Sequence, residues 1–328
     1  MGEKIGIIGA GGWGIALSIL LNRLKYKIYM WEPIKENYEI LIKKRESPDY
    51  FKGIKIPRSI EISNSIKDIV SETTILIIVV RSSFFKKTIN LIKKFYRNQP
   101  VLIGTKGLDF KTCKRMSEIL KELINTENFA VISGPTIAKE IVKGYPTAAV
   151  IASYNDSIAE YFQKLISNEK FRIYTTNDII GVEIGGSFKN VIAIGAGIID
   201  GFYFGMNTKA SYISRGLNEM IKIGKILGGE EKTFRGLSGL GDLITTSFSK
   251  YSRNRSFGEG IIKIGKDKYL KKTKMVIEGI PATKAFYKLS KKYKVELPLT
   301  ESIYRIIYKN ASPIDEIKRL MLRELKEE

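Results

Sequence analysis

Residues 181–201 read GVEIGGSFKNVIAIGAGIIDG, and this stretch decides how the second half of the chain is built. Its apolar residues surround almost the whole circumference of the expected helix, which is typical of a helix buried inside a protein. Lys189 lies in the middle. Small residues flank this lysine at helical spacing: Gly186, Ala193, Ala196 and Gly197. The pattern predicts a buried lysine beside a space that another group fills. The alternative is a surface helix whose lysine extends to water.

Length and composition are those of a globular protein with a full core. Of 328 residues, 44% are hydrophobic and 27% are charged, and the length suffices for two domains of about 150 residues each. The formal net charge of +21 comes from basic residues spread along the whole chain. This distribution favours a general positive potential that attracts small anions, rather than a binding site for nucleic acid. A nucleic-acid-binding protein is the alternative, and it requires an affinity that depends steeply on salt.

Two absences restrict the chemistry. The chain has no histidine, which excludes a Ser-His-Asp triad, a histidine base and a histidine metal ligand. Cys113 is the single cysteine, which excludes disulfide frameworks and cysteine-rich metal sites. We therefore expect no metal, a reducing cytoplasmic location, and acid–base chemistry by Lys, Asp, Glu or Tyr. The apolar residues 5–21 include five glycines at patterned positions, so neither a targeting signal nor a membrane segment is expected there.

Residues 4–31 have the order strand, glycine-rich turn, helix, strand. We expect strands over 4–8 and 27–31 and a helix over 15–24, with Gly-Ala-Gly-Gly-Trp-Gly between the first strand and the helix. Glycines at this spacing permit a tight turn and let backbone N–H groups approach a pyrophosphate. The segment predicts a Rossmann-type dinucleotide site. Its expected cofactor contacts include the glycines Gly9, Gly11, Gly12 and Gly14.

Glu32 ends the second expected strand. A carboxylate at this place binds the adenosine ribose hydroxyls and repels an additional ribose phosphate. The residue therefore favours NAD over NADP, although the nearby Lys35 weakens that preference.

The periodicity of the chain changes near residue 178. Before it, apolar runs alternate with amphipathic helical stretches, which predicts a mostly parallel sheet covered by helices on both faces. Further strands are expected over 75–80, 101–104, 130–133, 148–152 and 171–175. After it, only helices are expected, among them 213–227, 281–293, 301–308 and 313–325. The predicted domains are a dinucleotide-binding domain over 1–178 and a helical substrate-binding domain over 179–328.

Two polar loops follow expected strands of the first domain. Lys106 and Thr136 lie in these loops, and the carboxyl ends of parallel strands are where ligands bind in open α/β sheets. Each loop alone is equally well explained as an ordinary strand-to-helix turn.

Polar loops are also expected in the helical half. Asp242 ends one of them, and the sequence SRNR at 252–255 places two arginines around an amide, which suits phosphate recognition. An exposed basic loop is the alternative for SRNR. Residues 207–209 form another polar turn. Hydride transfer to a ketone leaves an alkoxide that needs a proton, and in a chain without histidine Lys189 is the expected donor, oriented by Asp242.

Taken together, the chain resembles the bacterial NAD(P)-dependent glycerol-3-phosphate dehydrogenases nearly end to end. The matching segments are GAGGWGIAL at 9–17, TKGL at 105–108, SGPTIAKE at 133–140, GGSFKNVIAIGAGIIDG at 185–201, NTKA at 207–210, ISRGL at 213–217, GLSGLGDLITTSFSKYSRNRSFG at 236–258 and VIEG at 276–279. The resemblance implies an oxidoreductase that interconverts dihydroxyacetone phosphate and sn-glycerol 3-phosphate for glycerophospholipid synthesis. It also implies a Rossmann-type domain followed by an all-helical domain, and a homodimer.

The resemblance assigns roles to positions of this sequence. Lys189 matches the proton donor and acceptor, accompanied by Asp242 and Lys106 as catalytic residues. The substrate contacts implied are Lys106, Gly134, Thr136, Lys189, Asp242, Ser252, Arg253 and Asn254. The cofactor contacts implied, besides the glycine turn and Glu32, are Trp13, Lys106, Ala138, Arg253, Val276 and Glu278.

Two positions depart from the family pattern. Pro33 stands where many bacterial relatives have an Arg or His able to meet the NADP phosphate, and this favours NAD further. Arg81 replaces the usual proline after the strand at 75–80. A dehydrogenase of a 3-hydroxy acid or of 6-phosphogluconate on the same plan is the remaining enzymatic alternative. A simple carboxylate substrate would not need the SRNR segment.

Overall fold

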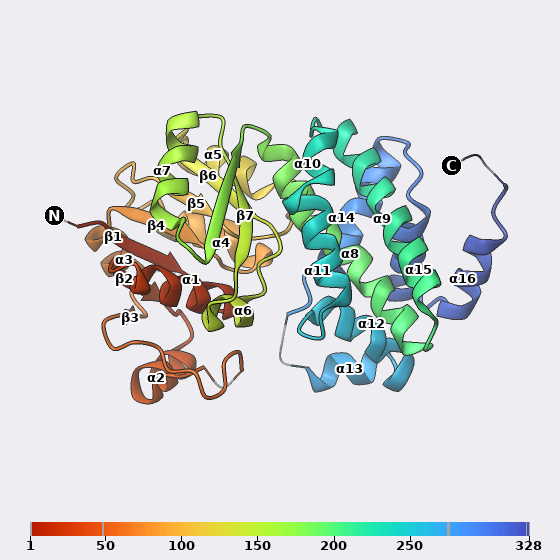
Figure 1. The fold of residues 1–328 in the computed structure, drawn as a ribbon, viewed down its shortest axis with the longest axis horizontal. Coiled ribbons are helices and arrows are strands. Elements are labelled where there is room, and N and C mark those ends of the chain that lie inside the picture. Colours follow the sequence, from red (N-terminus) through yellow and green to blue (C-terminus); the bar gives the residue numbers. More distant parts are fainter. Residues whose placement is uncertain (1, 48, 274–275, 326, 328) are drawn as a thin grey trace. The chain divides into compact units, whose positions relative to one another are not determined.

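The computed structural model describes residues 2–47, 49–273, 276–325 and 327, and the chain divides into two compact units (Figure 1). The first unit contains residues 1–106 and 115–179, and the second contains 107–114 and 180–328. Segment 107–114 thus joins the second unit, whereas a single boundary at 178 assigns it to the first domain. Within the second unit Leu108 is buried, Cys113 lies 3.7 Å from the carbonyl oxygen of Ala285, and Lys288 donates to the carbonyl of Phe110. These contacts explain the departure from one boundary.

The first unit is built on one eight-stranded sheet with the order β3-β2-β1-β4-β5-β6-β7-β8. All neighbouring strands are parallel except β6 and β7. The strands are β1 Lys4–Ile8, β2 Lys27–Trp31, β3 Glu61–Ser63, β4 Ile75–Ile78, β5 Val101–Ile103, β6 Phe129–Ser133, β7 Thr147–Ala152 and β8 Phe171–Thr176. The central strand β4 is buried along its whole length, as expected of a sheet covered on both faces.

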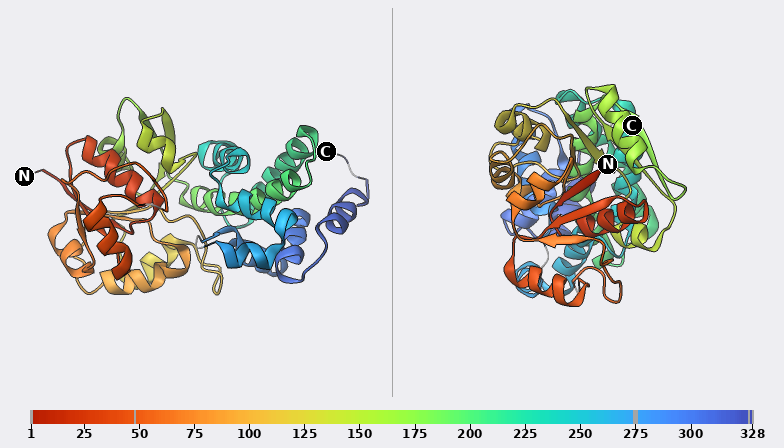
Figure 2. Two further views of the ribbon diagram at one scale, coloured as in Figure 1. Left: turned by 90° about the horizontal axis from the view of Figure 1, so that it is seen from below. Right: turned by 90° about the vertical axis from the view of Figure 1, so that its left-hand side faces the viewer.

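Helices cover both faces of this sheet (Figure 2). They are α1 Gly12–Arg23, α2 Lys35–Lys44, α3 Ile66–Glu72, α4 Ser82–Ile92, α5 Met116–Ile124, α6 Ala138–Lys143 and α7 Asp156–Ile166. Helix α1 packs beside α6, and α4 packs between α3 and α5. The mostly parallel α/β architecture expected for the N-terminal half is confirmed.

The regular elements described in the second unit are all helices. Its elements are α8 Ile179–Gly201, α9 Met206–Ile226, α10 Glu231–Arg235, the π-helical turn η1 Leu237–Gly241, α11 Asp242–Phe248, α12 Arg253–Ile264, α13 Lys266–Lys272, α14 Gly279–Lys292, α15 Pro298–Tyr308 and α16 Pro313–Met321. Helix α8 is long and apolar enough to cross a membrane. However, 94% of its most apolar window is buried inside the protein, as in a core helix.

Lys189 is only 7% exposed, so the surface-helix alternative for residues 181–201 is wrong. The glycines on and near this part of α8 permit close packing of backbones. A Cβ atom on Gly197 would lie 1.9 Å from the carbonyl oxygen of Arg255, and one on Gly258 would lie 1.9 Å from that of Ile194. Backbone of α12 therefore occupies the space that we expected beside α8 at Gly197.

Three segments that the sequence suggested as loops belong to helices. SRNR is the N-cap and first turn of α12, Asp242 begins α11 directly after η1, and residues 207–209 lie in the first turn of α9. The signal for α12 was available, because Ser252 is a typical N-cap residue and its hydroxyl accepts from Arg255 N at 3.2 Å. The glycines before Asp242 suggested a loop, so the helical turn η1 was not predicted. They permit close packing, since a Cβ on Gly239 would lie 2.0 Å from the carbonyl oxygen of Phe234.

Candidate functional site

The glycine turn after β1 has two positions that only glycine fits. Gly9 has φ +120°, a conformation that other residues rarely adopt. A Cβ on Gly14 would lie 1.9 Å from the carbonyl oxygen of Gly9. The turn is therefore closed by direct contact between its own backbone groups. A Cβ on Gly11, by contrast, meets nothing within 4 Å, so open space lies beside that residue.

Helix α1 begins on this turn without a side-chain cap. Gly11 is its N-cap, no side chain bonds to the first N–H groups from that position, and the first turn carries no acidic residue. The N-terminus of a helix has unsatisfied N–H groups and a positive potential, which suit a phosphate. In the same turn, the indole Nε1 of Trp13 is buried with no hydrogen-bond partner among the described residues. Open space at Gly11, uncapped N–H groups and an unpaired donor fit a dinucleotide.

Glu32 follows β2 and is 7% exposed. Its Oε1 accepts from Ile34 N at 2.9 Å. Burial raises the pKa of Glu32, and the hydrogen bonds from Ile34 and Asn37 and the charge of Arg81 oppose that rise. Arg81, the N-cap residue of α4, thus acts electrostatically on the carboxylate that we expect to read the ribose.

Lys106, Gly134 and Thr136 meet at the carboxyl ends of β5 and β6. The Lys106 ammonium donates to the carbonyl oxygen of Gly134 at 2.9 Å and to Thr136 Oγ1 at 3.2 Å. The Thr136 hydroxyl donates to the same carbonyl at 3.1 Å. Because β5 and β6 are adjacent and parallel, their loops lie at one edge of the sheet. The sequence placed these residues in separate loops, and the fold brings them together.

In the second unit, Lys189 and Asp242 form a buried ion pair. The Lys189 Nζ and Asp242 Oδ1 atoms are 2.5 Å apart, with side chains 9% and 2% exposed. Thr246 completes the group, since Lys189 Nζ also donates to Thr246 Oγ1 at 2.9 Å and that hydroxyl lies 3.3 Å from Asp242 Oδ1. Asp242 and Thr246 are one turn apart on α11. The sequence analysis missed Thr246, although its i, i+4 spacing from Asp242 was visible.

Asn254 is connected to the residue next to Lys189 by a hydrogen bond. Its Nδ2 donates to Asn190 Oδ1 at 2.7 Å, and Asn190 is the residue after Lys189. Its Oδ1 accepts from Gly279 N at 2.9 Å. The Asn254 amide therefore ties the start of α12 to α8 and to the first residue of α14. The sequence analysis did not assign Asn190 a role, because an amide on a buried helix reveals its partner only in the fold.

The other predicted contacts occupy helix starts and adjoining segments. Ser252 is the N-cap of α12, and Arg253, the first residue of that helix, is exposed. Ala138 begins α6 in the first unit. Val276 and Glu278 are half-buried in the segment before α14, where Glu278 is the N-cap residue.

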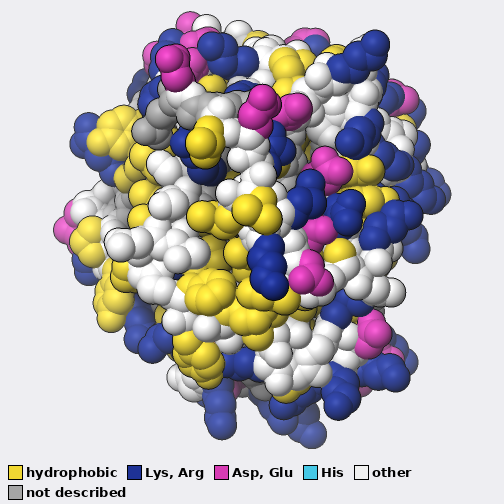
Figure 3. All heavy atoms as spheres, turned by 90° about the vertical axis from the view of Figure 1, so that its right-hand side faces the viewer, with side chains coloured by type: hydrophobic (Ala, Val, Ile, Leu, Met, Phe, Trp, Pro, Cys, Tyr) yellow, Lys and Arg dark blue, Asp and Glu magenta, His cyan; other side chains and the backbone are white. Residues whose placement is uncertain are grey.

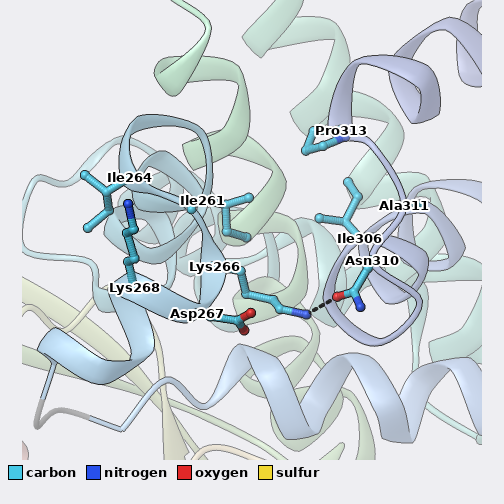
Figure 4. A pocket seen from close by; sticks show the side chains of 10 residues that line it. Ile261, Ile264, Lys266, Asp267, Lys268, Ile306, Asn310, Ala311 and Pro313 are labelled. Carbon is cyan, nitrogen blue, oxygen red and sulfur yellow. Dashed lines mark hydrogen bonds between the residues drawn. The ribbon is translucent and has the colours of Figure 1, made fainter.

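A surface pocket of about 400 Å³ lies elsewhere in the second unit (Figure 4). Apolar residues Ile261, Ile264 and Ile306 line it together with Lys266, whose ammonium donates to Asn310 Oδ1. None of the predicted site residues lines this pocket.

Comparison with known proteins decides the family. A family model described as the N-terminus of NAD-dependent glycerol-3-phosphate dehydrogenase matches residues 4–159, and one for its C-terminus matches residues 178–318. The chain belongs to the NAD-dependent glycerol-3-phosphate dehydrogenase family. The resemblance stated from the sequence motifs is thereby confirmed.

Relatives of the same family match over nearly the whole chain. A glycerol-3-phosphate dehydrogenase [NAD(P)+] of Thermoanaerobacter sp. (strain X514) is 41% identical over 99% of this chain and 98% of its own length. One from Fusobacterium nucleatum is 39% identical over 98% of both chains. The crystal structure of glycerol-3-phosphate dehydrogenase from Coxiella burnetii has a TM-score of 0.94 at 32% identity and covers 98% of this chain and 99% of that one.

Proposed function

We propose that this chain interconverts dihydroxyacetone phosphate and sn-glycerol 3-phosphate with NAD or NADP. The proposal rests on the buried ion pair of Lys189 and Asp242, with the half-buried Thr246 beside it, in a chain of this family. This group places a lysine ammonium, held by a carboxylate and a hydroxyl, in the unit that lacks the dinucleotide fold. Such an ammonium is suited to protonate the oxygen of a ketone as it becomes an alcohol.

The proton steps follow from the Lys189 group. In reduction, Lys189 Nζ gives a proton to the C2 oxygen of the substrate as hydride arrives at C2. In oxidation, the neutral amine removes the hydroxyl proton. Asp242 and Thr246 accept hydrogen bonds from Nζ and fix its position. Bound NAD(P)H supplies the hydride, and the oxidised cofactor accepts it in reverse.

The first unit would hold the cofactor through its backbone. The uncapped N-terminus of α1 supports a pyrophosphate contact there, and Glu32, directly after β2, is proposed to bind the adenosine ribose. Trp13 and Ala138 are proposed to line the same site. Lys106, with Thr136 and Gly134, is proposed to contact both cofactor and substrate.

The second unit would recognise the phosphate. Arg253 supplies an exposed guanidinium, and Asn254 and the N-cap Ser252 lie beside it at the start of α12. A guanidinium next to a helix N-terminus is a favourable arrangement for a phosphate. Val276 and Glu278, before α14, are proposed as further cofactor contacts.

NAD is the proposed preference, because the Glu32 carboxylate would repel a 2′-phosphate and Pro33 offers no cation to meet one. We further propose a cytoplasmic homodimer that serves glycerophospholipid synthesis. A single cysteine in 328 residues supports the reducing location. The homodimer and the role in lipid synthesis are supported by the family resemblance. Light scattering of the purified protein tests the dimer, and one chain per particle would contradict it.

The decisive experiment measures initial rates of NADH and NADPH oxidation with dihydroxyacetone phosphate. We expect rapid turnover with NADH and slower turnover with NADPH. Absence of turnover with both, together with activity on a 3-hydroxy acid or 6-phosphogluconate in the oxidative direction, would overturn the proposal. The basic residues on the face in Figure 3 are scattered among acidic, apolar and neutral side chains, which gives no separate support to a nucleic-acid partner.

A further inference from the structure

A second buried lysine lies in the helical unit, outside the Lys189 group. Lys209, in the first turn of α9, has a side chain that is 7% exposed. Its ammonium lies 2.8 Å from both carboxylate oxygens of Asp200, near the end of α8. The same ammonium lies 4.6 Å from the centre of the Phe248 ring, at the end of α11. A buried lysine of this kind needs its partners, because an unpaired buried charge is strongly destabilising.

Asp200 is shared with α12. The Nε atom of Arg255 donates to Asp200 Oδ2 at 2.5 Å, and its Nη1 lies 3.3 Å from Glu259 one turn later. Asp200 lies in the last turn of α8, where the helix dipole favours the nearby cations Lys209 and Arg255. The cluster of Asp200, Lys209, Arg255 and Glu259 therefore connects α8, α9 and α12.

Arg255 is also fixed through its backbone. A Cβ atom on Gly197 would lie only 1.9 Å from the carbonyl oxygen of Arg255. The backbones of α8 and α12 are therefore in direct contact here. The Arg255 N–H donates to the N-cap hydroxyl of Ser252. Arg255 follows Arg253 and Asn254 directly in the chain. The place of this one residue thus determines where the first turn of α12 presents its donors.

We propose that Asp200 and Lys209 are positioning residues for phosphate recognition, acting through Arg255 on Arg253 and Asn254. The inference rests on the proposed function, since it deepens the role of the same α12 turn. Lys209 neutralises Asp200 and holds both of its oxygens, and Asp200 in turn holds the guanidinium of Arg255. Without Lys209, the half-buried Asp200 carboxylate keeps its bond to Arg255 but loses its neutralising charge, so the position of the start of α12 is less firmly fixed.

The test is Lys209→Met, which keeps most of the side-chain volume and removes the charge. We expect the KM for dihydroxyacetone phosphate to rise at least about tenfold, because small displacements of positioned groups have large effects. At saturating substrate kcat should stay within about threefold, and the Kd for NADH should change much less than the KM, because only Arg253 of the displaced residues is also an implied cofactor contact. Lys209→Arg should restore most of the affinity, since a guanidinium also offers two donors to one carboxylate.

Lys225→Met is the matched control. Lys225 is on the same helix and its ammonium lies 2.9 Å from Glu231, but both side chains are substantially exposed. Removing an exposed pair of this kind should change KM by less than about twofold. Thermal unfolding of every variant, and assays well below the lowest Tm, separate stability from affinity.

Three results would overturn the inference. The first is an unchanged KM in Lys209→Met, and the second is a fall in kcat with no change in KM. The third is an equal loss of NADH and substrate affinity, which indicates general structural damage. If Lys209→Met does not fold, Asp200→Asn replaces it in the same assays with the same expectations. Failure of the proposed function is distinguishable, because the wild-type chain itself would then not reduce dihydroxyacetone phosphate.

Discussion

The two units build their polar sites from different groups. In the first unit the turn at 9–14 is shaped by glycines, and the N–H groups of α1 are left for a ligand. In the second unit the chemistry lies in side chains that are buried as ion pairs, Lys189 with Asp242 and Lys209 with Asp200. A backbone site depends on local spacing in the sequence. A side-chain site depends on residues that only the fold brings together.

Two helix N-termini make the same contrast. Helix α1 has no side-chain cap, whereas α15 is capped by a carboxylate from another helix. Glu219 of α9 accepts hydrogen bonds from the backbone N–H groups of Leu299 and Thr300 and from the Thr300 hydroxyl. At α15 the protein itself satisfies the first N–H groups, whereas at α1 these groups are left open in a glycine turn, which suits an anion.

The largest effect is expected at Lys189. Lys189→Ala should lower kcat by about 10²–10⁴-fold, because the variant lacks the proposed proton donor. The Kd for NADH, measured by fluorescence titration, should stay the same, since Lys189 is not among the proposed cofactor contacts. If the variant loses both NADH affinity and turnover, Lys189 is structural and the contrast between the two units fails.

A pair of glycines tests the backbone site. Gly14→Ala should lower the free energy of unfolding by about 1–3 kcal/mol or more, because its Cβ would lie 1.9 Å from a carbonyl oxygen. Gly11→Ala is the control for folding, since its backbone is extended and its Cβ meets open space. This second variant should keep its Tm and weaken NADH binding. A Gly11→Ala protein that binds NADH normally would show that the pyrophosphate does not approach this turn.

Glu219 gives a pH-dependent effect on stability. Burial raises the pKa of Glu219 to about 7 from 4.5, against the opposing hydrogen bonds of Leu299 and Thr300. The folded chain therefore binds this proton more tightly than the unfolded chain. The stabilisation is complete below pH 4.5 and is lost as the pH rises through 7, by up to about 3 kcal/mol.

Denaturant unfolding from pH 5 to 8 measures this effect. The difference in free energy of unfolding between the wild type and Glu219→Gln should shrink across that interval and become constant above it. The informative quantity is the slope of this free-energy difference against pH, because the Glu219→Gln substitution also changes a hydrogen bond, and that change contributes equally at every pH. Parallel pH curves for the two proteins would rule out a raised pKa at Glu219.

The smallest effect is expected at the ribose end of the cofactor site. Arg81→Ser removes a positive charge that acts on Glu32. It should lower kcat/KM for NADPH relative to NADH by a few fold, roughly the effect of one partly screened charge. Glu32→Gln should shift the ratio towards NADPH. An unchanged ratio in both variants would mean that neither side chain reads the 2′ position.

Much of the fold was predictable because it depends on local pattern. The strands at Lys4–Ile8 and Lys27–Trp31 and the buried helix α8 follow from apolar runs and their period. The start of α12 was interpreted as a loop because SRNR has no apolar period, although Ser252 is a good cap. Local periodicity identifies elements by their buried face, and it misses helix starts made of polar residues.

The site was predictable only in part. Lys189 attracted attention because a lone lysine in an apolar helix is unusual, and Asp242 because a glycine-rich loop preceded it. Their contact spans 53 residues of sequence, and no spacing rule specifies it. Glu219 gave no signal, since a glutamate on an amphipathic helix normally faces water. Buried polar pairs are determined by tertiary packing.

Segment 107–114 has a consequence for how the chain is made. It leaves the first unit and returns, so the polypeptide passes between the units three times. Cys113 contacts Ala285, which is synthesised 172 residues later. At about 5–20 residues per second, Cys113 waits on the order of ten to thirty seconds for this partner. Neither unit is thus a contiguous product of translation, and the second is completed only when segment 107–114 meets residues that are synthesised much later.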